Sequence, residues 1–102
     1  NSFIFPGIGL GLWVGHVRRV TDGMFLDAAK ALAAQVTDAD LAGGAVYPQL
    51  SRIQDCSQAV ACAVIRRAVA EGHAEPSALQ NLEPRVRLAM WVPRYRPFRH
   101  GP

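Results

Sequence analysis

Hydrophobic and polar residues along most of the chain recur at the three- and four-residue spacing that is typical of amphipathic helices. Thr21 is a good N-cap, and the helix that it predicts extends to about Val36. The apolar stripe of this helix contains Met24, Phe25, Ala28, Leu32 and Val36. Thr37 restarts a short helix, which the pair Gly43-Gly44 ends, and Tyr47-Pro48 marks a loop.

The second half of the chain repeats this helical pattern. The longest helix is predicted over residues 51–71, with Gly72 as its stop. Its buried stripe contains Ile53, Cys56, Val60 and Val64. The remaining features are a turn at Glu75-Pro76-Ser77, a last helix over residues 82–91, its cap Asn81, and Pro84 in its first turn, where proline is tolerated. The pattern contains no internal repeat and predicts a mainly α fold.

The first segment is apolar on every side. Residues 3–5 predict a short strand or an extended lead-in, which Pro6-Gly7 ends. Residues 7–15 then have the composition of a buried helix, although each glycine costs about 1 kcal/mol of helix stability relative to alanine. That cost is tolerable only where the small faces let another backbone or a ligand approach closely. We therefore expect this segment to be packed inside a larger body.

The run Gly7-x-Gly9-x-x-Leu12 partly matches a dinucleotide-binding loop. Leu12 occupies the third glycine position, and the motif also needs a full strand before it and a ribose-binding acid about 20 residues further on. Asp27 and the acids after it lie inside predicted amphipathic helices. We therefore favour packing over nucleotide binding as the role of these glycines.

Composition adds one feature, a basic end. The chain has 102 residues, of which 50% are hydrophobic and 19% are charged, which fits one small globular domain or part of a larger one. Its net charge is +3, and no acidic residue follows Glu83. Arginines and aromatic residues alternate after that point: Trp91, Arg94, Tyr95, Arg96, Phe98 and Arg99. Such a tail can bind nucleic acid or dock onto a protein surface. Since no other helix has a basic face, we favour docking and expect no nucleic-acid partner.

Candidate chemistry is sparse. The three histidines lack the spacing of metal ligands: His16, His73 and His100. No Ser or Cys nucleophile comes with a base and an orienting acid, so we predict no catalytic residue and no metal site. Cys56 and Cys62 lie about 240° apart on one predicted helix and cannot bridge each other. Two such thiols favour a reducing, cytoplasmic setting, and the apolar stretch over residues 3–17 is too short to cross a membrane.

One run of residues is more specific than these patterns. Residues 1–11 read Asn-Ser-Phe-Ile-Phe-Pro-Gly-Ile-Gly-Leu-Gly, and later segments continue in register with it: residues 17–25, 27–33, 41–50, 53–57 and 90–99. Taken in this order, the segments resemble the malic enzyme family over essentially the whole chain. On this resemblance, the chain is identified as the C-terminal segment of a malic enzyme. Some residues depart from the family pattern, with smaller ones expected at the first two: Trp13, His16, Pro84 and Arg85.

The resemblance implies an enzyme that oxidatively decarboxylates L-malate to pyruvate and CO2, using NAD or NADP and Mg2+ or Mn2+. It implies a mainly helical C-terminal segment of a larger α/β, Rossmann-containing enzyme. Residues 1–75 would belong to the substrate-cleft and NAD-binding region, and residues 76–102 would form a C-terminal helix and a basic tail. The implied partners are L-malate and pyruvate, the rest of the malic enzyme chain, and further copies in a homo-oligomer.

Asn1 is the one residue to which the resemblance gives a substrate-binding role. It matches the second member of an Asn pair that lines the malate pocket, where an amide can donate a hydrogen bond to a carboxylate without adding charge. The family's catalytic lysine and tyrosine, its metal-binding carboxylates and its nucleotide-binding core have no counterpart here, so the cofactor-binding residues are unknown. We therefore expect the chain alone to be inactive and, with its apolar first segment uncovered, to self-associate. The alternative is a small helical interaction module with a basic docking tail.

Overall fold

The computed structural model describes residues 4–35 and 50–90. Its elements are α1 (Ile4–Val14), α2 (Asp22–Gln35), α4 (Leu50–Ala70), the 3₁₀ helix η1 (Pro76–Leu79) and α5 (Leu82–Met90). Over these two ranges the chain forms no strand, and the mainly helical prediction is confirmed. The short helix and loop predicted over residues 37–48 lie outside the described residues.

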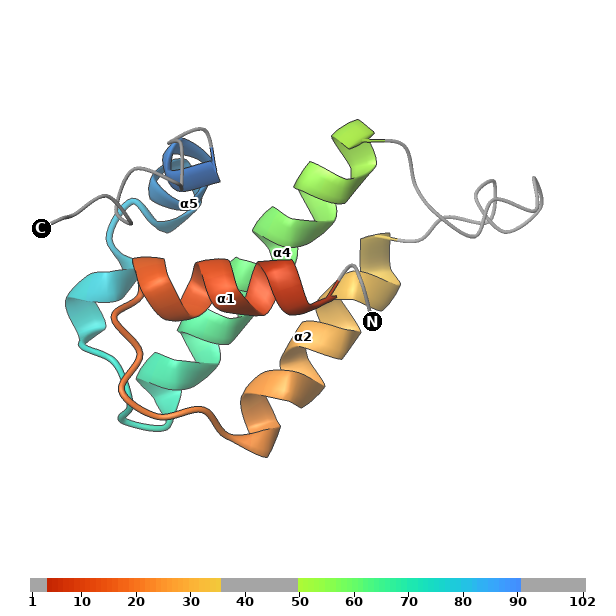
Figure 1. The fold of residues 1–102 in the computed structure, drawn as a ribbon. Helices are drawn as coiled ribbons and strands as arrows, with labels where there is room; N and C mark the ends of the chain where they lie inside the picture. The colour runs from red at the N-terminus through yellow and green to blue at the C-terminus, as the bar shows by residue number, and fades with distance from the viewer. Residues whose placement is uncertain (1–3, 36–49, 91–102) are drawn as a thin grey trace, which may run out of the picture.

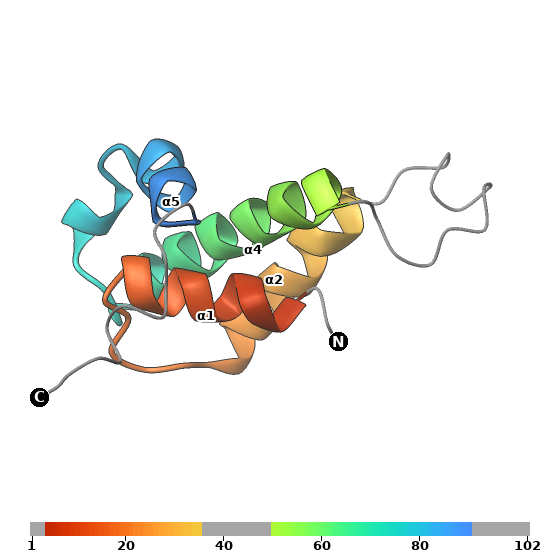
Figure 2. The ribbon, with the colours of Figure 1, turned by 45° about the horizontal axis from the view of Figure 1, so that its top comes forward.

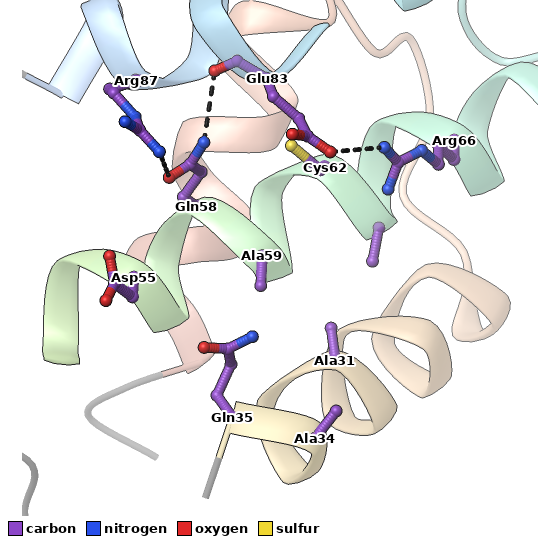
Figure 3. A pocket seen from close by; sticks show the side chains of 11 residues that line it. Ala31, Ala34, Gln35, Asp55, Gln58, Ala59, Cys62, Arg66, Glu83 and Arg87 are labelled. Atoms are coloured by element: carbon purple, nitrogen blue, oxygen red, sulfur yellow. Dashed lines mark hydrogen bonds and ion pairs between the residues drawn. The ribbon is translucent and has the colours of Figure 1, made fainter.

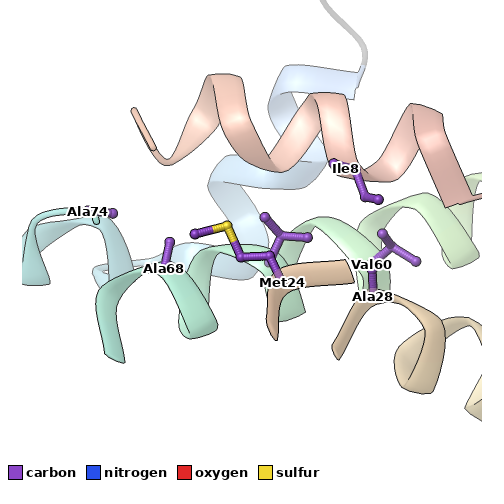
Figure 4. Close-up of a cluster of buried hydrophobic side chains, with 7 residues drawn as sticks. Ile8, Met24, Ala28, Val60, Ala68 and Ala74 are labelled. Carbon is purple, nitrogen blue, oxygen red and sulfur yellow. The ribbon is translucent and has the colours of Figure 1, made fainter. Parts of the chain in front are cut away.

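The longest helix, α4, is the centre of the fold, and α1 and α2 both pack against it (Figures 1 and 2). Two apolar cores form on α4. The first joins it to α1 and α2 (Figure 4) and consists of Ile8, Met24, Ala28, Val60, Val64, Ala68 and Ala74. The second joins it to α1, η1 and α5 and consists of Leu10, Ala61, Cys62, Ile65, Ala78, Leu82 and Val86. Ile8 and Leu10 of α1 thus enter different cores, and these two contacts hold α1 across α4.

The predicted buried stripes are largely confirmed. The stripe residues that are buried are Met24 and Ala28 on α2, and Cys56, Val60 and Val64 on α4. The prediction is wrong for Phe25, whose side chain is 40% exposed. Residue 25 lies about 100° around the helix axis from Met24, the residue that enters the core, so its ring faces outward. Val36 and the side chain of Ile53 lie outside the described part of the chain.

The start of α1 also differs from the sequence prediction. The helix begins at Ile4, so the strand or extended lead-in is wrong for Ile4 and Phe5. Pro6 is the third residue of α1, in the first turn, where a backbone N–H would have no partner within the helix. The proline therefore belongs to the beginning of a helix and does not end a strand.

On the side of α1 that faces α4, and just after its end, three glycines recur at four-residue spacing. We call them the glycine seam: Gly7, Gly11 and Gly15. A Cβ atom at Gly7 would lie 2.7 Å from the Cβ of Val60, and one at Gly11 would lie 2.9 Å from the carbonyl oxygen of Ala61. No side chain fits in that space, so the two helices approach closely only because glycine is present. The close backbone approach expected from these glycines is confirmed, and its partner is α4.

Gly72 ends α4, as predicted. Its φ of 81° lies in the left-handed region that favours glycine. The N–H of His73 donates to the carbonyl oxygen of Ala68 at 2.8 Å, and the N–H of Gly72 donates to that of Val69 at 3.1 Å. This pair of hydrogen bonds is the Schellman motif, which satisfies carbonyl groups at the end of a helix.

The end of α1 has the same motif with a different residue. The N–H of Val17 donates to the carbonyl oxygen of Leu12 at 3.1 Å, and the N–H of His16 donates to that of Trp13 at 3.3 Å. His16 takes the place of the usual glycine and has a φ of 49°. A left-handed conformation is strained for a residue with a Cβ atom, so His16 is a costly residue at this position.

The last helix is confirmed as α5, and the predicted turn before it is the 3₁₀ helix η1, which Pro76 begins. The carbonyl oxygen of Asn81 accepts a hydrogen bond from the N–H of Arg85 at 3.0 Å, as an N-cap carbonyl does. The φ of Asn81 is 48°, which is not the extended backbone usual at an N-cap. Pro84 lies in the first turn of α5, as predicted.

Candidate functional site

A polar hollow among the described residues lies between α2, α4 and α5 and has a volume of about 480 Å³ (Figure 3). Short alanine side chains from α2 and α4 face it: Ala31, Ala34, Ala59 and Ala63. Its polar groups come from all three helices: Gln35, Asp55, Gln58, Arg66, Glu83 and Arg87. Because small residues leave space between two helices here, the hollow follows directly from the alanine-rich sequence of α2 and α4.

Four polar residues of this hollow, Gln58, Arg66, Glu83 and Arg87, interact with one another. Arg66 Nη2 lies 3.3 Å from Glu83 Oε2, and Gln58 Nε2 donates to the carbonyl oxygen of Glu83 at 3.4 Å. Arg87 Nη2 donates to Gln58 Oε1 at 3.2 Å. The Arg66 and Glu83 side chains are both more than half exposed, so their ion pair is worth well under about 1 kcal/mol. The network links α5 to α4, and we interpret it as a helix-joining surface rather than a reaction centre.

Cys62 is the one thiol beside the hollow. Its side chain is 3% exposed, and burial raises the pKa of the thiol, with Glu83 adding to the rise and Arg66 opposing it. A raised pKa keeps the sulfur protonated at neutral pH, whereas the nucleophile in thiol chemistry is the thiolate. Cys62 is therefore a packing residue of the second core.

A second hollow, of about 650 Å³, lies where the start of α2 meets the end of α4. Thr21 Oγ1 donates to Glu71 Oε1 at 2.6 Å and accepts the backbone N–H of Met24 at 3.4 Å, which confirms Thr21 as the N-cap of α2. Arg67 Nε donates to Glu71 Oε2 at 2.8 Å. The hydrogen bond from Thr21, followed by the one from Arg67, lowers the pKa of Glu71. Both oxygens of this carboxylate have partners within the chain, so it holds two helix ends together.

Gly23 makes room for this junction. A Cβ atom at that position would lie 2.5 Å from Arg67 Nε and 2.5 Å from Glu71 Oε2. Arg67 also reaches Asp27 on α2, with Nη1 3.5 Å from the carboxylate. Sequence reasoning identified Thr21 but not Arg67, Glu71 or Gly23, because the contacts that join α2 to α4 here link residues 40 or more positions apart. Two local signals exist: a glycine in the first turn of a helix, where its low helix propensity calls for a reason, and the i,i+4 spacing of Arg67 and Glu71.

The remaining predicted features have mixed outcomes. Asn1 and the basic tail lie outside the described residues, so the substrate contact and the docking role stay predictions. Cys56 and Cys62 are both buried on α4 and are not bonded to each other. Within residues 4–35 and 50–90, no three His, Cys, Asp or Glu side chains gather into a group that could hold a metal ion. No helix in the same ranges is long and apolar enough to cross a membrane.

The partial dinucleotide motif lies entirely inside a helix. Gly7, Gly9 and Leu12 all belong to α1, and Gly7 is packed against Val60 of α4. A phosphate-binding loop instead presents backbone N–H groups ahead of a helix. Packing is therefore confirmed as the role of Gly7, whereas Gly9 has no neighbour within 4 Å of its Cβ position.

Comparison with known proteins gives one consistent result. The family profile described as "Malic enzyme, NAD binding domain" matches residues 1–69. The NAD-dependent malic enzyme of Psychrobacter arcticus is 38% identical over 99 residues, and that of Pseudomonas aeruginosa is 41% identical over 99 residues. Both matches cover 97% of this chain. The NADP-dependent malic enzyme of Dictyostelium discoideum is 40% identical over 95 residues, or 93% of this chain.

The chain is much shorter than these relatives. Each of the three alignments covers 18% of the relative's own length. No solved structure matches the chain. The similarity therefore concerns one segment of a much longer protein.

Proposed function

The chain belongs to the malic enzyme family, and we propose that it is a working part of an enzyme that oxidatively decarboxylates L-malate to pyruvate and CO2 with NAD or NADP as the oxidant. The observation that carries this proposal is the extent of the match, which includes nearly the whole chain at about 40% identity. In this account the described helices are a scaffold. The reaction itself depends on groups elsewhere in a malic enzyme.

In the proposed reaction, malate would lose a hydride from C2 to NAD or NADP and a proton from its C2 hydroxyl, and the resulting keto acid would then lose CO2 and take up a proton at C3. A divalent metal ion, Mg2+ or Mn2+, supplies Lewis-acid polarisation of the C2 oxygen when it is bound. The described residues do not fit such an ion, because they bring no group of three ligands together. We therefore assign the metal to parts of a malic enzyme outside these helices, and we expect the chain alone to be inactive.

We propose that Asn1 contributes to the malate pocket. Its amide would donate a hydrogen bond to a malate carboxylate without the charge that would favour other anions. Asn1 stands three residues before Ile4, where α1 begins. The glycine seam fixes α1 on α4, so tight packing at Gly7 and Gly11 would hold in place the helix that follows Asn1 in the sequence.

We also propose a homo-oligomeric parent enzyme in a reducing, cytoplasmic setting. The support for the setting is the state of the thiols, since Cys56 and Cys62 are buried and not joined by a disulfide. If the thiols of Cys56 and Cys62 were oxidised in the parent enzyme purified from its natural source, this part of the proposal would be contradicted.

A chimera tests the proposal. The matched 99 residues of the Pseudomonas aeruginosa NAD-dependent malic enzyme are replaced by this chain, and malate-dependent reduction of NAD is measured with Mn2+. We expect activity in this chimera and none in the isolated chain. In the chimera, Asn1→Ala should raise the KM for malate about tenfold or more, which corresponds to the loss of a hydrogen bond to a charged group. A folded chimera that binds NAD but does not oxidise malate would overturn the proposal.

A further inference from the structure

The outer side of α1 is apolar and uncovered. Phe5 is 58% exposed and Trp13 is 52% exposed, and Gly9 is exposed between them. Residues 5, 9 and 13 follow one another at four-residue spacing, so they share one side of the helix. Figures 1 and 2 show this helix on the outside of the bundle, with α4 behind it and no other labelled helix in front. The outer side of this apolar segment is therefore uncovered among the described residues, and its packing inside a larger body stays a prediction.

The uncovered surface continues onto α2. The rings of Phe5 and Phe25 meet edge to face, with centroids 6.5 Å apart. Phe25 is 40% exposed, so its contact with Phe5 leaves much of it open. We call Phe5, Gly9, Trp13 and Phe25 together the outer apolar face. It contains no charged side chain, and a continuous apolar surface that crosses two elements is uncommon on a protein that works alone.

Gly9 indicates what kind of contact this face makes. The seam glycines are explained, because a Cβ atom at Gly7 or Gly11 would collide with α4. Gly9 weakens the same helix relative to alanine, yet nothing lies within 4 Å of the position of its missing Cβ. Within the described residues the glycine therefore has no packing role. Because Gly9 has no side chain, another backbone could approach the helix closely between Phe5 and Trp13.

We propose that the outer apolar face docks the remainder of a malic enzyme chain, with a backbone segment of that remainder seated at Gly9 between Phe5 and Trp13. This inference rests on the proposed function. All four residues of the face lie within residues 1–69, the part that matches the family's NAD binding domain. The matched relatives contain a large body of protein beyond the 18% that this chain covers, which makes that body the natural partner. The lack of charge on the face favours such a permanent, apolar interface over a charged ligand.

Substitution at Gly9 tests the docking in the chimera described above. Gly9→Leu should leave the isolated chain folded with an unchanged or higher Tm, because the site is open there and leucine is a better helix former. In the chimera, the same change should overpack the interface and lower malate-dependent NAD reduction about tenfold or more. Ala33→Leu adds a leucine at an exposed position of α2 outside the face, and serves as the matched control with an expected loss of less than about twofold.

Crosslinking identifies the occupant. The photoreactive residue p-benzoylphenylalanine is placed at position 13 of the chimera, and the crosslinked peptides are mapped. We expect crosslinks to the Pseudomonas portion of the same chain. Crosslinks only to position 13 or its neighbours in a second copy would overturn the proposal, as would a Gly9→Leu chimera that is as active as the Ala33→Leu control. An unaltered chimera that gives the expected crosslinks but no malate oxidation would contradict the proposed function and leave the docking supported.

Discussion

The backbone N–H of Arg18 donates a hydrogen bond to the carbonyl oxygen of His73 at 2.8 Å, and so joins the chain after α1 to the chain after α4. The Arg18 guanidinium strengthens this link, because Nη2 donates to the carbonyl oxygen of Gly72 at 3.0 Å. Its other contact, at 3.1 Å, is with the Glu75 carboxylate, and those two side chains are 54% and 72% exposed. The hydrogen bond to the backbone should therefore matter more than the ion pair.

The first prediction separates these two contacts. Arg18→Ala should lower the free energy of unfolding by about 1 kcal/mol, because the Gly72 carbonyl loses a charged donor at a helix end. Glu75→Gln should lower it by less than about 0.5 kcal/mol, the usual worth of an exposed ion pair. Urea unfolding followed by circular dichroism measures both. Equal losses in the two variants would show that the ion pair is the main contact.

The second prediction concerns acid stability. The Thr21 and Arg67 hydrogen bonds lower the pKa of Glu71, so this carboxylate is charged in the folded chain at a pH where it would be protonated in the unfolded chain. Its contribution is fully present above the ordinary glutamate pKa and is lost as the pH falls through the lowered value. Urea unfolding at a series of pH values should therefore show a loss of stability in this acid range.

Variants of Thr21 check the cause. Thr21→Val removes both the donor to Glu71 and the N-cap acceptor, and should cost about 1 kcal/mol at neutral pH while flattening the acid dependence. Thr21→Ser keeps the hydroxyl and should keep both properties. If Thr21→Val retained the full acid dependence, Thr21 could not be the main cause of the lowered Glu71 pKa.

The third prediction uses the strained end of α1. His16 has a φ of 49° at the position that glycine occupies at the end of α4. His16→Gly should raise the free energy of unfolding by up to about 1 kcal/mol, since the left-handed conformation costs glycine nothing. His16→Ala retains a Cβ atom and should give no gain. A gain of equal size in both variants would mean that the imidazole, rather than the backbone, is the source of the cost.

The fourth prediction compares two glycines of one helix under the same substitution. Gly11→Ala should cost about 1 to 3 kcal/mol, because its Cβ would lie 2.9 Å from the Ala61 carbonyl oxygen and 3.1 Å from the Val64 Cβ. Gly9→Ala should raise the stability of the isolated chain by about 0.5 to 1 kcal/mol, since its site is open there. Thermal unfolding of both variants is the measurement. A loss of stability in Gly9→Ala would show that the isolated chain already covers Gly9.

Local signals in the sequence predicted the helices well. Thr21 lies directly before the first residue of α2, and Gly72 lies two residues after the last residue of α4, because capping depends on groups only a few positions away. Pro6 was misleading for the same local reason, since proline is compatible with both the end of a strand and the first turn of a helix. The sequence predicts Phe25 in the core, because the apolar stripe of one helix does not reveal how much of that stripe the neighbouring helix covers.

Contacts between distant parts of the chain could not be predicted from the sequence. Arg18 meets Gly72 and Glu75, and Thr21 meets Glu71, only after α1 and α2 have packed on α4. The glycine seam was foreseen as a place of close approach, but its partner was not. The predicted site residue Asn1 also lies beyond such local signals. It is identified from a family resemblance, and no periodicity or spacing in this chain indicates it.

The most direct test of the central claim is the product balance of the chimera with the Pseudomonas aeruginosa enzyme. Pyruvate, CO2 and NADH are measured after incubation with L-malate, NAD and Mn2+, beside a Pseudomonas enzyme that lacks the replaced segment. We predict pyruvate, CO2 and NADH in equal amounts from the chimera and none from the enzyme without the segment. A folded chimera that forms no pyruvate, or a truncated enzyme that forms as much as the chimera, would contradict the claim that these 102 residues are a working part of a malic enzyme.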